Sequence, residues 1–131
     1  MSAVAAVRGA ALARLRGALA VNRVWDGADG RGTVPYAVLR DVVAVDWGTK
    51  DRAGREVRVG VTVRDEGGTP ARCETLAAAA EAALLDLPRD LSGAESDWRA
   101  ASVVPVRCTV LGEGQGRWAG IVDVRVRVLA A

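Results

Sequence analysis

The sequence predicts an α+β fold, a mainly antiparallel sheet of four to five strands with two helices packed on one face, in the order α-β-β-β-α-β-β. Two observations carry this prediction. Apolar residues recur every three or four positions over residues 4–19 and 70–87, as in amphipathic helices. Valines alternate with polar residues over residues 55–64 and 118–129, as in strands with one buried face. With 131 residues, half of them hydrophobic, we expect one domain over residues 1–131.

The first third of the chain predicts a helix and two strands. The helix covers residues 4–19, and arginines separate its apolar positions, which are Val4, Val7, Ala11, Leu12, Leu15 and Leu19. A short strand over residues 21–25 leads into the glycine-rich loop 26–33. The next strand covers residues 36–45 and follows Pro35, which cannot donate a ladder hydrogen bond and is tolerated at the first position of a strand.

The following strand shows the clearest alternation in this half of the chain. Its apolar face is predicted to hold Val57, Val59, Val61 and Val63. Its polar face is predicted to hold Glu56, Arg58, Thr62 and Arg64. Between this strand and the preceding one, residues 47–54 have the polar, glycine-containing composition of a hairpin connection.

The second half of the chain predicts a helix and a hairpin. Thr69 is expected to cap the helix and Pro70 to be its first residue, and the helix ends before Pro88. Its buried stripe is expected to be Cys73, Leu76, Ala80, Leu84 and Leu87. Residues 88–99 are polar and predict a loop. Strands over 101–111 and 118–129 follow, joined by a turn in GEGQGR, with Val122, Val124, Val126 and Val128 on the buried face.

Composition argues against most catalytic chemistry. The chain has no histidine and a single lysine, Lys50, so the commonest general base and metal ligand are missing. GEGQG joins two strands and opens no helix, so it lacks the context of a dinucleotide-binding loop. We assign no catalytic residue, no cofactor and no metal. Cys73 and Cys108 are expected to be buried free thiols of a cytosolic protein.

Charge and hydropathy point to no particular partner class. The chain has 18 basic and 16 acidic residues, and the net charge of +2 is too small to argue for a nucleic-acid or membrane partner. We expect neither a membrane span nor a signal peptide. The tryptophans Trp25, Trp47, Trp98 and Trp118 fall at or beside strand ends, where they either anchor protein partners or close the core.

The polar side of the predicted sheet carries a second candidate surface. Arg58 and Arg64 on one strand, with Arg125 and Arg127 on another, form a basic surface with Glu56 and Asp123 as partners, or simply a solvated sheet face.

In element order and length, nearly the whole chain resembles the tail terminator, or tail-completion, proteins of long-tailed bacteriophages and gene transfer agents. The residues that carry the resemblance are the amphipathic first helix, the glycine-rich loop into PYAVL, the strand REVRVGVTVRD, the alanine-rich helix and the closing strand DVRVRVLA. The most specific part is Pro35, Tyr36, Val38 and Leu39 at the opening of a strand. The loop from Arg89 to Arg99 departs from the family pattern.

This resemblance implies a non-enzymatic structural protein that forms a ring, typically of six subunits. Such a ring caps the tail tube protein and docks to the head-side connector or stopper protein. DNA passes through its lumen without sequence specificity, and no membrane is involved. The expected location is the neck of a virion or gene transfer agent particle, assembled in the bacterial cytoplasm.

The interface candidates under this hypothesis fall into two groups. The hairpin 47–54, with Trp47, Lys50 and Arg52, and also Trp118, would contact other subunits or the tube. Arg58, Arg125 and Arg127 would line a polar lumen or a ring interface.

Two other interpretations stay open. The nearer one is another head-tail neck component, such as a head-closure or tail-tube protein, which placement within the particle would separate. The second is a small cytosolic α+β ligand-binding protein or enzyme, whose hallmark would be a concave apolar pocket with convergent polar groups.

Overall fold

The computed structural model of the 131-residue chain describes residues 1–27, 31–91 and 97–131. Two helices and five strands follow one another in the predicted order. Their bounds are α1 Ala3–Ala18, β1 Val24–Asp26, β2 Tyr36–Asp46, β3 Gly54–Glu66, α2 Ala71–Leu85, β4 Trp98–Gly114 and β5 Arg117–Ala130. The predicted α+β fold class is confirmed.

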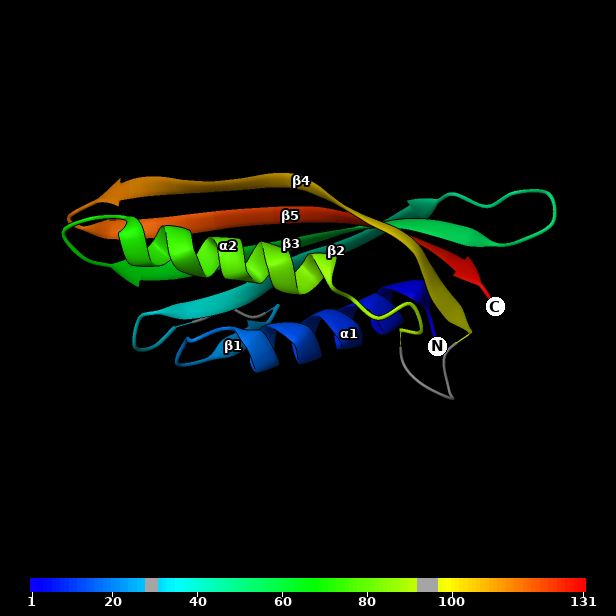
Figure 1. The fold of residues 1–131 in the computed structure, drawn as a ribbon, viewed down its shortest axis with the longest axis horizontal. Coiled ribbons are helices and arrows are strands. Elements are labelled where there is room, and N and C mark those ends of the chain that lie inside the picture. The colour runs from blue at the N-terminus through cyan, green and yellow to red at the C-terminus, as the bar shows by residue number, and fades with distance from the viewer. Residues whose placement is uncertain (28–30, 92–96) are drawn as a thin grey trace.

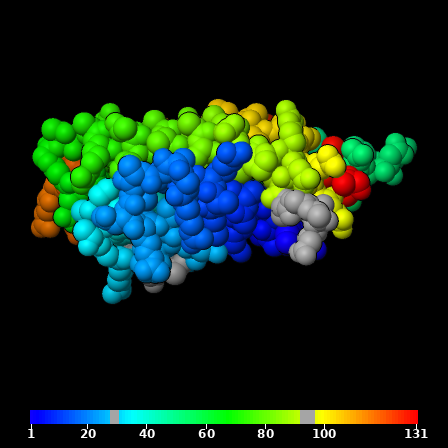
Figure 2. Space-filling model, turned by 60° about the horizontal axis from the view of Figure 1, so that its bottom comes forward, coloured from blue at the N-terminus to red at the C-terminus, as the bar shows by residue number. Residues whose placement is uncertain are grey.

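The five strands form one sheet in the order β1-β2-β3-β5-β4. Only β1 runs parallel to its neighbour, and the other pairs are antiparallel. Both helices lie on the same face of the sheet (Figure 1), where α1 packs against β1, β2 and β3 and α2 against β3, β4 and β5. Figure 2 shows α1 in blue and α2 in green side by side along this face. Neither helix has the length and hydropathy needed to cross a membrane.

The core is built on the adjacent strands β3 and β5. The predicted valines of both strands are fully buried against the helices: Val57, Val59, Val61, Val63, Val122, Val124, Val126 and Val128. Three of these pairs lie directly opposite each other in the ladder, for example Val59 and Val124. Each buried valine stabilises the fold by roughly 1.5–3 kcal/mol relative to an exposed one. Alternation alone therefore identified the inner face of the sheet correctly.

Helix α2 approaches the sheet closely because small residues lie at the contact. A Cβ atom added to Gly120 on β5 would lie 3.0 Å from the Cβ of Ala77 and 3.4 Å from the Sγ of Cys73. Both helix residues are buried, as are Leu76, Ala80 and Leu84 of the predicted stripe. Leu87, also in that stripe, is buried just beyond the helix.

Some predicted boundaries were wrong by one to three residues. Pro70 is the N-cap of α2 and not its first residue, and the Thr69 hydroxyl accepts a weak bond from the Ala71 N–H at 3.4 Å. Strand β4 begins at Trp98 and not at 101, because residues 98–100 already pair with residues 128–130 of β5. The predicted loops 26–33 and 88–99 lie partly outside the described residues, at 28–30 and 92–96. Elsewhere, the GEGQGR turn is confirmed: Gln115 and Gly116 both have positive φ, as in a tight hairpin.

Two burial predictions were also wrong. Cys108 is exposed, because it lies on β4, whose outer side carries only the Asp90–Arg99 bridge among the described residues. Thr62, expected on the wet face, is 6% exposed. The Arg40 side chain covers it and donates to its hydroxyl at 3.0 Å. Arg40 can lie there because Gly60 has no side chain: an added Cβ would come within 2.2 Å of the guanidinium.

Replacing Gly120 with valine should destabilise the fold by about 1–3 kcal/mol, because the new side chain would push α2 away from β5. Urea unfolding followed by tryptophan fluorescence measures this change. The matched control is Gly68→Val, at a position where an added Cβ meets nothing within 4 Å. Equal midpoints for both variants would show that α2 does not depend on this contact.

Candidate assembly surfaces

One face of the sheet carries no helix formed by the described residues, and we call it the open face. It consists of the side chains of β2, β3, β4 and β5 that point away from α1 and α2. Most of its charged residues lie in two adjoining clusters. They are Arg40, Asp41, Glu56, Arg58, Arg107, Asp123, Arg125 and Arg127. Five arginines against three carboxylates leave this set with a net charge of +2.

The first cluster joins β3 to β5 through Glu56. Its carboxylate lies 3.5 Å from Arg125 and 3.2 Å from Arg127. Arg58, next to this cluster, lies directly opposite Arg125 in the ladder and is exposed. Two arginines face each other there, so the positive charge on this part of the open face is only partly neutralised.

The second cluster is centred on Asp123 of β5. Arg107 of β4 lies 3.2 Å from it, and Arg40 of β2 also pairs with it. Asp123 thus links β5 to β4 on one side and, across β3, to β2 on the other. Because these side chains are partly exposed, each pair adds at most about 1 kcal/mol to stability.

The predicted hairpin connection continues this surface at one end. The Trp47 N–H donates to Gly54 at 3.0 Å and the Thr49 N–H to Arg52 at 2.9 Å, so the connection is held by its own backbone. The Arg127 guanidinium lies 5.0 Å from the centre of the Trp47 ring, within cation–π range. Lys50 and Arg52 are exposed near the tip, which projects beyond both helices (Figure 1). Six of the seven predicted interface residues therefore lie on or beside one end of the open face.

Trp118, the seventh, lies at the opposite end of the sheet. Its indole N–H donates to the Gly67 carbonyl at 3.0 Å, and its ring lies against Gly112 and the core. The structure therefore does not bring Trp118 together with the other six candidates. These contacts close the core at the rim of the sheet.

The open face also has an apolar part that sequence reasoning missed. Val43 and Val45 of β2 are 55% and 53% exposed, and Val106 of β4 is 44% exposed. They line a hollow of about 610 Å³ with Glu56 and Arg58 in its lining. The unbroken apolar run 42–45 was the available signal, because a strand that is apolar at every position must direct half of those side chains outward.

A larger hollow, of about 910 Å³, lies at the other end of the open face. Its lining is mainly charged, and two of the residues in it, Arg64 and Glu113, pair with each other. It does not match the apolar pocket expected of a ligand-binding protein or enzyme. No three potential ligands among histidine, cysteine, aspartate and glutamate gather for a metal in the described parts of the chain.

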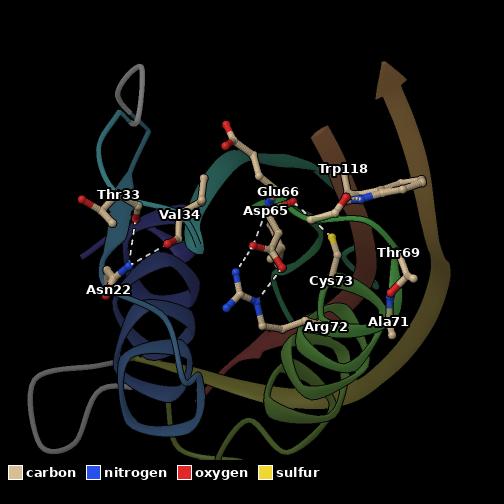
Figure 3. A network of polar contacts seen from close by, with 12 residues as sticks. Asn22, Thr33, Val34, Asp65, Glu66, Thr69, Ala71, Arg72, Cys73 and Trp118 are labelled. Carbon is tan, nitrogen blue, oxygen red and sulfur yellow. Dashed lines mark hydrogen bonds and ion pairs between the residues drawn. The ribbon is translucent and has the colours of Figure 1, made fainter. Parts of the chain in front are cut away.

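Asp65 anchors helix α2 to the end of β3 (Figure 3). Its side chain is 3% exposed, accepts from Arg72 Nε at 2.8 Å and accepts from the Glu66 N–H at 2.8 Å. The bond from Arg72 is the main reason that the pKa of Asp65 lies below its usual value, although burial opposes it. Burial, with the nearby Asp65 charge, raises the pKa of Cys73, so this thiol stays protonated.

Replacing Asp65 with asparagine should destabilise the protein by about 1–3 kcal/mol at neutral pH, since it removes a charge-assisted hydrogen bond. A lowered folded-state pKa gives stability that is present above the unfolded-state pKa and is lost as pH falls through the folded-state value. The variant should therefore lose less stability than the parent between about pH 5 and pH 2. Urea midpoints across this range test both points, and parallel curves would contradict the assignment.

A family model and a solved structure match this chain over almost its whole length. A family model described as "Tail completion protein gp17" matches residues 3–129. Among solved structures, a chain in "Virion of native gene transfer agent (GTA) particle" is 24% identical, with a TM-score of 0.70. The match covers 99% of this chain and 100% of that one, and it shows a shared fold. No curated protein sequence matches significantly.

Proposed function

The chain belongs to the tail completion protein gp17 family, and we propose that it forms a ring that caps the tail tube and joins it to the head-side connector or stopper protein. The match over residues 3–129 carries this proposal, because it covers all seven helices and strands save the last residue of β5. The role is structural and involves no catalysis. Its place is the neck of a phage or gene transfer agent particle, assembled in the bacterial cytoplasm.

DNA crosses this ring through a central lumen. The open face suits the wall of this lumen because its charged set carries a net +2 per subunit. Ion pairs with carboxylates orient several of its arginines, and this arrangement does not present them for reading bases. Such a surface attracts phosphates without regard to sequence. The hairpin 47–54 projects beyond both helices (Figure 1), so it is available to contact the tube or a neighbouring subunit.

The native mass in solution tests the ring directly. Six chains of 13.6 kDa give a species of about 82 kDa, measured by native mass spectrometry over a range of concentrations. If the free protein stays monomeric, the same count is made on isolated tails, where the tube can act as template. Tails that carry the protein in any arrangement other than a ring at the head-proximal end would contradict the proposal and favour another neck component.

Replacing both Arg125 and Arg127 with glutamate should leave the subunit folded but lower the yield of DNA-bearing particles by at least roughly tenfold. The change reverses the local charge and places two new carboxylates beside Glu56, which makes three in all. Circular dichroism verifies folding. If the ring species disappears from the native mass spectrum, the two arginines act in ring formation. If the ring persists while particle yield falls, they act in the lumen.

A matched control replaces Arg14 and Arg16 of α1, on the helix side of the sheet, with glutamate. It changes the net charge by the same amount. If the two double variants give equal particle yields, the open-face arginines have no part in assembly or DNA passage.

A further inference from the structure

We propose that neighbouring subunits join their sheets: residues 41–46 of β2 in one copy pair antiparallel with residues 107–112 of β4 in the next. The inference rests on the proposed ring and identifies its subunit contact. The sheet has two lateral edges, one along β2 and one along β4. Each edge is open over these residues, and the two edges suit each other in length, direction and side chains.

The first edge is the second half of β2. Strand β1 pairs only with residues 37–39, and the ladder between β2 and β3 then shifts at a bulge between Leu39 and Asp41. From Asp41 to Asp46, the pairing with β3 is regular, and no described strand lies on the other side. This stretch has no proline or lysine of the kind that protects edges in proteins that stay monomeric.

The second edge is the later part of β4. Its outer side is covered only near its start, where Asp90 bridges to Arg99, as far as the described residues extend. Pro105 and the bulge beside it interrupt the strand, and another bulge lies between Gly112 and Gly114. Between these irregularities, residues 107–112 pair regularly with β5. The regular stretch therefore has the same length as residues 41–46.

Exposed apolar side chains concentrate on these two strands. Six large hydrophobic residues are exposed in the described chain, and four lie on β2 and β4: Val43, Val45, Val106 and Leu111. All four lie on or beside the two stretches and on the open-face side. Contact between the edges would set the valines of one copy beside the apolar residues of the next and remove them from water.

Strand direction fits the same contact. Strands β2, β3, β5 and β4 alternate in direction, so β4 runs opposite to β2. A neighbour rotated about an axis roughly along the strands therefore presents its β2 antiparallel to β4 without turning over, and this head-to-tail contact can close a ring.

The same contact is compatible with the proposed lumen. Side chains of β2, β3, β4 and β5 line the hollow of about 610 Å³ on the open face. With the open face toward the axis, as in the proposed function, Arg58, Arg125 and Arg127 face the lumen and both helices lie outside. Because residues 41–46 and 107–112 occupy different levels of the sheet, the strands must be inclined to the ring axis, as in closed barrels.

The exposed thiol of Cys108 provides a native reporter in the β4 stretch, and Cys73 is buried. Cys108 lies opposite Val122, on the helix side of the sheet. Cysteines are introduced one at a time at residues 42, 44 and 46, which share that side on β2. Paired strands bring such residues within disulfide distance, so one of the three variants should give covalent dimers and higher oligomers under mild oxidation of assembled rings or tails.

The controls come from the same strand. Val43→Cys and Val45→Cys point to the opposite side although they are more exposed, so they should cross-link to Cys108 at least about fivefold less than the best of the three. Adding Cys108→Ser should abolish the cross-link. Equal cross-linking from both sides of β2, or none from any variant in intact assemblies, would overturn the proposed pairing.

These outcomes separate the contact from the function. A ring of about 82 kDa, or a ring on tails, without the cross-link rejects the edge pairing and leaves the proposed function standing. A protein that is absent from particles rejects both. As a second readout, Val45→Lys should lower the ring fraction at least tenfold, because it places a charge on the apolar contact, whereas Leu85→Lys, an exposed position on α2, should not.

Discussion

The pairing of β3 with β5 is the constraint on which the rest of the structure depends. Their facing valines form a dry layer under both helices, and the regular ladder between Gly54–Leu129 and Glu66–Arg117 fixes which side chains point outward. A one-residue slip would send the core valines into water and the arginines against the helices. The register between β3 and β5 therefore determines both which side chains form the core and which form the open face.

This explains why most of the fold could be predicted from the sequence. Period-two alternation in β3 and β5 and period-three-to-four spacing in the helices are local signals of burial, and these elements were placed within one to three residues. The errors came from long-range contacts. Thr62 is covered by Arg40, which lies 22 residues away in the chain, and Cys108 is exposed because β4 is an edge. No local pattern encodes either fact.

The proposed assembly surface was predictable only in part, for a similar reason. Polar alternation placed the arginines of β3 and β5 on one face. It could not show that Glu56 pairs with Arg125 and Arg127, or that Asp123 pairs with arginines of β2 and β4. Nor could it distinguish Trp47, which lies against Arg127 on the open face, from Trp118, which closes the core. A tryptophan at a strand end has the same signature in either role, and only the tertiary neighbours separate the two.

The alternating direction of β2, β3, β5 and β4 has a consequence for how such a fold can change during evolution. The two outer strands run in opposite directions because the number of long strands is even. Gaining or losing one strand would make the outer strands run the same way, so the proposed antiparallel contact between subunits could no longer form. Two strands added as a hairpin, or longer loops, would keep this parity. Diversification is therefore expected to proceed by paired insertions and loop growth, while the strand count between the two edges stays even.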